Sequence, residues 1–240
     1  MGIKAENIIK KYGHRTVVQD VTVGLEPASI VSLMGPNGAG KTTLFHIIAG
    51  LETQDAGTVF IDDIDVSGKP MFYRARCGMV YLPQESSIIR DMSVEDNLIT
   101  IFQMIKTPKN EIKEGVESLL ERFDLTHVRK GLGRTLSGGE RRRTEIARSL
   151  ITKPKYLLLD EPFAGVDPVS VEEIQTIIFE LKKEGLGILI TDHNARELLG
   201  ISDFVYFLKS GVVSYFGNSR DVQEYSDVVD NYLGVNFNRK

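Results

Sequence analysis

The sequence carries the segment Gly35-Pro36-Asn37-Gly38-Ala39-Gly40-Lys41-Thr42 between an apolar run and a helical pattern. The apolar run, Ile30 to Met34, predicts a buried strand, and the helical pattern begins near Thr42. Glycines let such a loop curl, so that several of its N–H groups point inward at phosphate oxygens, helped by the positive end of the dipole of the following helix. This context predicts a phosphate-binding loop in which Lys41 contacts the β- and γ-phosphates and Thr42 contacts Mg²⁺.

Further strands and helices are predicted on both sides of this loop. The early strands alternate polar and apolar residues and the middle ones are nearly all apolar, which favours a partly solvated antiparallel sheet beside a buried parallel sheet. The predicted strands are Ile3 to Ile9, Val17 to Val23, Ile30 to Met34, Thr58 to Ile61, Met79 to Leu82, Tyr156 to Leu159, Ile188 to Thr191, Phe204 to Leu208 and Val212 to Phe216. The predicted helices are Thr42 to Ala49, Val94 to Ile105, Glu111 to Phe123, Gly138 to Ile151, Val169 to Glu184 and Asp221 to Tyr232.

Two of these helices follow one another without an intervening strand. We therefore expect residues 90–150 to form a helical subdomain inserted into an α/β core made of residues 1–89 and 151–240. The core is expected to hold a mixed sheet with an antiparallel β subdomain. A chain of 240 residues is long enough to bury such a core as one domain.

Composition excludes several classes of protein. A net charge of −4 gives no general reason to expect nucleic-acid binding, and the run Arg141-Arg142-Arg143 is interpreted as a solvated helix face. The single cysteine, Cys77, cannot form an internal disulfide. No stretch approaches the roughly 18 apolar residues that span a bilayer. We therefore expect a cytoplasmic chain whose membrane role, if any, is exerted through partner subunits.

Two carboxylates follow a second apolar strand. Tyr156-Leu157-Leu158-Leu159-Asp160-Glu161 ends at the edge of a parallel sheet where ligands bind, and Pro162 then stops the strand. Asp160 is predicted to hold Mg²⁺, and Glu161 to act as general base for an attacking water.

The segment Leu136-Ser137-Gly138-Gly139-Glu140 predicts the start of a helix with a capping box. Ser137 suits the N-cap, and Glu140 stands three residues later. An ordinary helix start does not explain Gly138 and Gly139, because glycine costs about 1 kcal/mol in a helix. The paired glycines favour close approach of an anion to the first-turn N–H groups.

This segment resembles the signature sequence of ABC ATPases, and other elements of that family occur in order over nearly the whole chain. The resemblance implies a P-loop NTPase fold of the ABC type, with ATP and Mg²⁺ as cofactors. It implies that Tyr12 stacks on adenine, that Gln84 touches Mg²⁺, and that His193 contacts the γ-phosphate. It also places Thr43 among the nucleotide contacts and identifies Ala164-Gly165-Val166-Asp167 as a loop that crosses to a second subunit.

In this family two subunits pack head to tail around two ATP molecules. The resemblance therefore implies a homodimer in which Ser137, Gly138, Gly139 and Glu140 of one copy complete the site of the other. It also implies two transmembrane permease subunits, which we expect to dock on the segment Ser86 to Met92. Within that segment Ile88, Ile89 and Arg90 are the candidate contacts.

Longer matches resemble the ATPase of lipopolysaccharide-export systems of Gram-negative bacteria. They are Tyr81-Leu82-Pro83-Gln84-Glu85, Leu136 to Arg143, Asp160 to Pro168 and Thr191-Asp192-His193-Asn194. The chain departs from that family at Ile89, where an aromatic residue is usual, and in the tail after Leu233. The alternatives are the ATPase of a branched-chain amino-acid importer and an ABC ATPase that moves no solute. A binding module without turnover is disfavoured, because Glu161 and His193 are both present.

Overall fold

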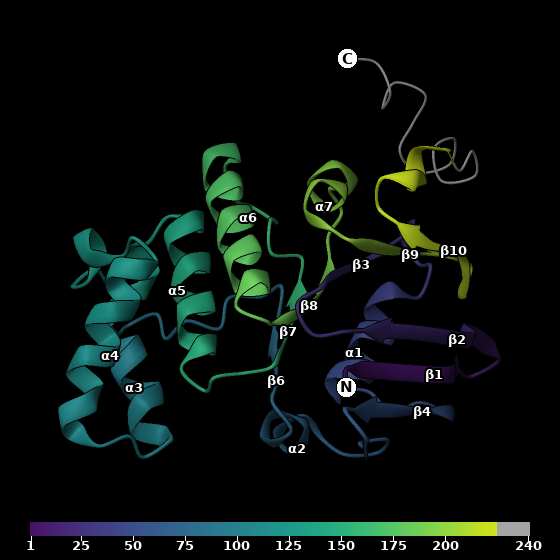
Figure 1. The fold of residues 1–240 in the computed structure, drawn as a ribbon, viewed down its shortest axis with the longest axis horizontal. Helices are drawn as coiled ribbons and strands as arrows, with labels where there is room; N and C mark the ends of the chain where they lie inside the picture. Colours follow the sequence, from purple (N-terminus) through teal and green to yellow (C-terminus); the bar gives the residue numbers. More distant parts are fainter. Residues whose placement is uncertain (225–240) are drawn as a thin grey trace.

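Two β-sheets and the helices packed on them make up residues 1–224, the part of the chain that the computed structural model describes (Figure 1). The smaller sheet is antiparallel and has the order β2-β1-β4-β5. Its strands are β1 (Ile3–Tyr12), β2 (Arg15–Leu25), β4 (Ala56–Ile61) and β5 (Ile64–Asp65). This sheet confirms the predicted antiparallel β subdomain.

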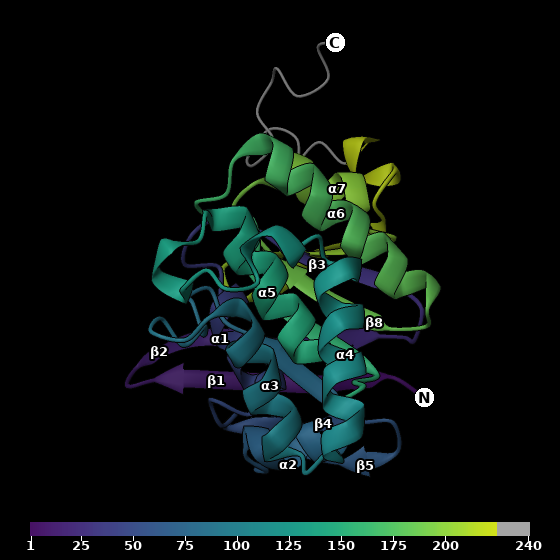
Figure 2. The same cartoon turned by 90° about the vertical axis from the view of Figure 1, so that its left-hand side faces the viewer.

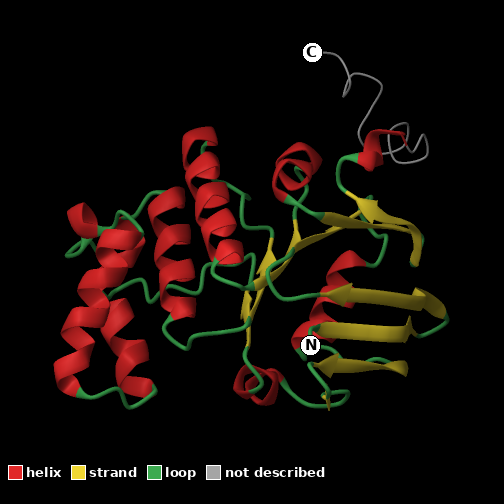
Figure 3. Ribbon diagram, in the orientation of Figure 1, coloured by secondary structure: helices red, strands yellow, loops and turns green. Residues whose placement is uncertain are grey.

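The larger sheet is mixed and has the order β10-β9-β3-β8-β7-β6. All of its neighbouring strands are parallel except β9 and β10, which form an antiparallel pair at one edge. Its strands are β3 (Ile30–Met34), β6 (Met79–Leu82), β7 (Tyr156–Asp160), β8 (Gly187–Thr191), β9 (Phe204–Lys209) and β10 (Val212–Asn218). Figure 3 shows these strands in yellow as one twisted layer.

The parallel strands are buried on both faces, which explains their continuous apolar sequences. Leu158 and Leu189 pack with α1 (Lys41–Ala49) and with the smaller sheet. Their chain neighbours Leu157 and Ile188 point the other way, as successive strand residues do, and pack with α5 (Gly138–Leu150) and α6 (Pro168–Lys183). The helix that follows the phosphate-binding loop therefore lies between the two sheets.

Two further helices lie together at one end of the molecule. Figure 2 views that end, where α3 (Val94–Met104) and α4 (Lys109–Arg122) lie beside α5. Their apolar residues join the same core cluster as α6 and the large sheet. The division of the chain at residues 90 and 150 stays a prediction.

Some elements escaped the sequence patterns because they are short. They are the helices α2 (Met71–Arg76) and α7 (Ala195–Ile201), strand β5, and the 3-10 turns Thr126–Val128 and Gly133–Thr135. The helix expected from Asp221 to Tyr232 is described only over Asp221–Glu224, where it is a 3-10 turn. Its remainder, and the divergent tail after Leu233, lie outside the described residues.

Candidate functional site

The loop of residues 35–40 joins β3 to α1 and needs glycine at particular positions. Gly40 has φ = 100°, and a Cβ there would lie 2.6 Å from the carbonyl oxygen of Val17. Gly35 has φ = 142°, and a Cβ there would collide with the carbonyl oxygen of Leu208. Any other residue would force the loop away from its supporting strands, so these glycines fix the curl that the sequence predicts.

Lys41 lies folded over this loop. Its Nζ donates hydrogen bonds to the carbonyl oxygens of Gly35, at 2.7 Å, and Pro36, at 3.1 Å. Burial lowers the pKa of Lys41, and the nearby Glu161 carboxylate opposes that shift. The loop and Lys41 line one cavity of about 390 Å³ together with Thr42, Thr43, Glu161 and His193. The structure thus brings the phosphate-binding loop together with Glu161 and His193.

Asp160 is the last residue of β7 and is buried. Tyr81 donates its hydroxyl to Asp160 Oδ2 at 3.1 Å, and His46 Nε2 of α1 lies 3.8 Å from the same oxygen. Burial raises the pKa of Asp160, and the hydrogen bond from Tyr81 acts against that rise. The carboxylate therefore lies beside the helix that begins with Lys41 and Thr42.

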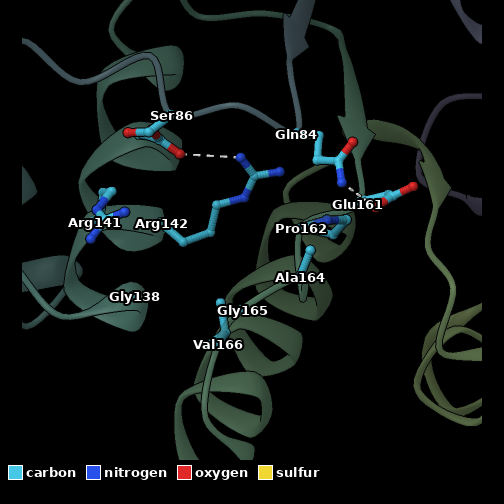
Figure 4. Close-up of a pocket in the computed structure, with 11 residues that line it drawn as sticks. Gln84, Ser86, Gly138, Arg141, Arg142, Glu161, Pro162, Ala164, Gly165 and Val166 are labelled. Carbon is cyan, nitrogen blue, oxygen red and sulfur yellow. Dashed lines mark hydrogen bonds and ion pairs between the residues drawn. The ribbon is translucent and has the colours of Figure 1, made fainter.

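Glu161 leaves the sheet in a left-handed conformation, with φ = 46°, while its N–H donates to the carbonyl oxygen of Thr191. Two polar side chains hold its carboxylate. Gln84 Nε2 donates to Oε2 at 2.6 Å, as Figure 4 shows, and His193 Nε2 lies 2.6 Å from Oε1. Burial raises the pKa of Glu161, and His193 opposes this. Strained backbone of this kind is common at functional sites.

Asp192 belongs to the same arrangement, although the sequence patterns did not single it out. Its carboxylate accepts hydrogen bonds from the N–H of Phe163 at 3.0 Å and of Asn194 at 2.9 Å. It therefore ties the segment after Glu161 to the segment that carries His193. Its place at the end of β8, directly before that histidine, was the available signal.

The predicted capping box is confirmed at the start of α5. The N–H of Glu140 donates to Ser137 Oγ, and the N–H of Ser137 donates to Glu140 Oε2. Gly138 and Gly139 also have a packing role, because a Cβ on Gly138 would lie 2.8 Å from the Gly165 carbonyl oxygen and one on Gly139 would collide with Ser170. Both glycines therefore allow α5 to approach α6 and the loop before it.

The structure does not bring this helix start to the phosphate-binding loop of the same chain. Gly138 instead lines a second cavity, of about 170 Å³, with Gln84, Glu161 and Gly165 (Figure 4). Ser137, Gly139 and Glu140 line neither this cavity nor the one beside Lys41. Glu161 lines both cavities and so stands between the two parts of the predicted site.

The interpretation of Arg141-Arg142-Arg143 as a solvated face is wrong for two of the three residues. Arg142 is buried and donates to the carbonyl oxygens of Pro83 at 3.0 Å and Asp160 at 3.2 Å. It also pairs with the buried Glu145, at 3.1 Å. Arg143 is buried as well and forms an ion pair with Glu173. The arginines connect α5 to the carboxylate strand and to α6.

Tyr12 lies at the end of β1 with about half of its surface exposed. Its hydroxyl donates to Glu52 Oε2 at 3.0 Å. Burial and this hydrogen bond raise the pKa of Tyr12, whereas a hydrogen bond with the side chain of Thr43 lowers it. Tyr12 therefore stands next to the first turn of α1, beside the cavity rather than among the residues that line it.

The segment of residues 86–92 is exposed except at Ile88. Ile88 is buried in the large core, which corrects its selection as a surface contact. Ile89 keeps 39% of its surface exposed and Arg90 is exposed as well. Asn97 fixes this segment, since its side chain accepts from the N–H of Ile89 and donates to the Ile89 carbonyl.

The helices of the whole described part of the chain bear on membrane association. Within residues 1–224, none of them is long and apolar enough to cross a membrane.

Comparison with known proteins places this site in a family. The sequence profile of the ABC transporter family matches residues 18–164. Lipopolysaccharide export system ATP-binding protein LptB of Haemophilus influenzae is 47% identical over 98% of each chain, and LptB of Escherichia coli K12 gives the same identity and coverage. A probable ABC transporter ATP-binding protein of Azorhizobium caulinodans is also 47% identical, over 98% of this chain and 84% of that protein.

Solved structures agree with the family of these relatives. The ADP conformation of an ATP-binding cassette of an ABC transporter has a TM-score of 0.86 at 29% identity, covering 98% of this chain and 99% of that one. A nucleotide-free cassette from an ABC transporter has the same TM-score at 26% identity, covering 97% and 98%. With the phosphate-binding loop, the paired carboxylates and the capped helix all in place, the chain belongs to the ABC transporter family as an ATP-binding and ATP-hydrolysing subunit.

Proposed function

We propose that this chain is the ATPase subunit of a lipopolysaccharide exporter, working as a homodimer beneath two transmembrane partners on the cytoplasmic face of the inner membrane. The observation that carries the substrate is the 47% identity to two LptB proteins over 98% of their length. The site itself supports ATP hydrolysis and says nothing of the transported molecule.

The phosphate-binding loop is proposed to hold the triphosphate. Backbone N–H groups of residues 35–40 and the N-terminus of α1 supply donors, and Lys41 supplies the charge. In this structure Lys41 Nζ is satisfied by the carbonyl oxygens of Gly35 and Pro36. A bound phosphate would replace these neutral acceptors with an anion, which forms stronger hydrogen bonds with an ammonium.

The residues around the cavity suit Mg²⁺, which prefers oxygen ligands and keeps several waters. Thr42 lines the cavity and offers a hydroxyl, and Gln84, which lines the adjoining cavity, offers an amide oxygen. Asp160, at the end of β7, offers a carboxylate fixed by Tyr81. When bound, the ion would neutralise charge on the β- and γ-phosphates. The chain's own contribution is the orientation of these oxygens.

Glu161 is proposed to accept a proton from the attacking water, and His193 to contact the γ-phosphate. Burial raises the pKa of Glu161 and so makes its carboxylate a better base than an exposed one. Its contacts with Gln84 and His193 hold that carboxylate at the cavity that Lys41 and Thr42 also line.

A second copy is proposed to complete each site with Ser137, Gly138, Gly139 and Glu140. In support, these residues lie apart from the loop of their own chain. The Glu161→Gln variant with ATP should elute as a dimer in size-exclusion chromatography with light scattering, and adding Ser137→Arg should return it to a monomer. A dimer that ignores Ser137→Arg would contradict the composite site.

Permease subunits are proposed to dock on residues 86–92, where Ile89 and Arg90 are exposed. Purification of the tagged chain from membranes tests this assignment and the substrate together. We expect two transmembrane proteins to be recovered, less of them with Ile89→Asp, and ATP hydrolysis to respond to added lipopolysaccharide. Recovery of amino-acid permease subunits instead would overturn the proposed substrate.

A further inference from the structure

One carboxylate beside the nucleotide cavity connects two structural elements. Glu52 Oε2 accepts the hydroxyl of Tyr12 at 3.0 Å, and its Oε1 accepts Lys10 Nζ at 2.8 Å. The Glu52 N–H in turn donates to the His46 carbonyl oxygen near the end of α1. Glu52 therefore links the end of β1 to α1, the helix that follows the phosphate-binding loop.

Lys10 closes this arrangement from the other side. It is 9% exposed, and its Nζ also donates to the carbonyl oxygen of Thr53 at 2.7 Å. The same Nζ lies 5.1 Å from the centroid of the Tyr12 ring. Lys10 and Tyr12 stand two residues apart on β1, so their side chains share one face of the strand. The ammonium therefore lies over the Tyr12 ring, about half of whose surface stays exposed to a planar ligand.

The charges in this group favour its ordered form. The hydrogen bonds from Lys10 and Tyr12 lower the pKa of Glu52, and the hydrogen bond with Glu52 raises the pKa of Lys10. An exposed tyrosine without partners would rotate freely about χ1, and a ligand would lose that freedom on binding. Here the hydroxyl is anchored before any ligand arrives.

We propose that Glu52 and Lys10 are positioning residues that hold the Tyr12 ring ready for the base of the nucleotide. This inference rests on the proposed role of Tyr12 as the adenine platform. It predicts that the group strengthens binding of the base and leaves binding of the phosphates unchanged. Affinity for ATP should then depend on Glu52, and affinity for inorganic tripolyphosphate should not.

Isothermal titration calorimetry with Mg²⁺ and either ATP or tripolyphosphate separates the two contributions. Glu52→Ala and Tyr12→Phe should each raise the Kd for ATP about threefold to tenfold, as expected when binding must immobilise one additional side chain. Neither should change the Kd for tripolyphosphate. Tyr12→Phe keeps both charges and so provides a variant in which Lys10 stays paired. Glu184→Ala removes a carboxylate from the exposed ion pair with Arg122 and is the matched control.

A double variant tests whether Glu52 acts through Tyr12. If it does, Glu52→Ala with Tyr12→Phe should bind ATP no more weakly than Glu52→Ala alone. Two outcomes would overturn the proposal and assign Glu52 to the phosphate-binding loop instead. One is a double variant whose increase in the Kd for ATP is the product of the two single increases, and the other is an equal increase in the Kd values for ATP and tripolyphosphate. Unchanged ATP affinity in Tyr12→Phe with a loss in Tyr12→Ala would overturn the anchoring role alone. Unchanged affinity in Tyr12→Ala would overturn the proposed adenine platform as well.

Discussion

Glu161 and His193 meet because the register of two neighbouring strands brings them together. Strands β7 and β8 are parallel, and Asp160 is paired with Thr191 at their carboxyl ends. Glu161 follows the first of these residues, and His193 comes two residues after the second. Their 2.6 Å contact is therefore set by the sheet rather than by a flexible loop. Asp192, between Thr191 and His193, accepts a further hydrogen bond from the N–H of Phe163.

Replacing Glu161 by glutamine tests the proposed base directly. Gln keeps the size of the side chain but removes the proton acceptor, so ATP turnover should fall by about 10²- to 10⁴-fold, the usual contribution of general base catalysis. ATP affinity should change little. Phosphate release and calorimetric binding, measured on the same preparation, separate the two effects. Turnover within a few-fold of the wild-type rate would assign the base to another residue.

The sequence predicted the parts of this site that lie in one continuous segment each. The phosphate-binding loop, the carboxylate strand and the capping box are all patterns of spacing, and the structure contains all three. Contacts between segments were not predictable in this way. Nothing in the residues around Arg142 indicates that its side chain reaches the Pro83 carbonyl oxygen, so its burial was not predicted.

The same limit explains Ile88 and the short helices. Ile88 and Ile89 are adjacent and chemically identical, so the sequence does not indicate which of the two faces the core. In the structure Ile88 is the buried one. Helices α2 and α7 span too few residues to show a helical period. Burial of neighbouring residues and short elements is decided by tertiary packing.

Gly139 should tolerate no side chain, because a Cβ there would collide with Ser170. Gly139→Ala is expected to push α5 away from α6 and to reduce ATP-dependent dimerisation and turnover. Ser170→Gly removes the colliding atoms, so the double variant should recover part of both. Equal defects in the single and double variants would show that this contact is not the cause. Gly200→Ala is the control, because the added Cβ would meet open space. Gly185→Ala is unsuitable because Gly185 has φ = 100°, which strains any other residue.

Arg142 should contribute strongly to stability through the charge of Glu145. That carboxylate is buried and accepts Ser86 Oγ and the N–H of Ser87 as well as Arg142. Arg142→Met leaves the buried charge without its cation and should lower the free energy of unfolding by about 3–5 kcal/mol. Adding Glu145→Gln removes that charge and keeps an acceptor oxygen, so part of the loss should return. Urea unfolding of the wild type and of these two variants measures this, and an unchanged midpoint for Arg142→Met would contradict it.

Asp62 should make stability depend on pH, since it joins the smaller sheet to β7. Its carboxylate accepts the hydroxyl of Tyr156 at 2.5 Å, Lys155 Nζ at 2.9 Å and the N–H of Gly2 at 3.1 Å. Burial by itself raises the pKa of Asp62, but these hydrogen bonds outweigh burial and hold the pKa below its ordinary value of 3.8. The folded protein therefore binds this proton less readily than the unfolded chain.

A carboxyl with a lowered folded-state pKa stabilises the protein fully above its unfolded pKa, and that contribution is lost as the pH falls through the folded pKa. Asp62→Asn should accordingly lower the free energy of unfolding by about 1–2 kcal/mol at neutral pH. The difference from wild type should narrow as the pH is taken below 3.8. Urea unfolding across this range measures the difference at each pH. If the difference in the free energy of unfolding between wild type and Asp62→Asn stays constant down to the acid transition, the charge of Asp62 contributes nothing to stability. Any lower stability of the variant would then come from altered packing alone.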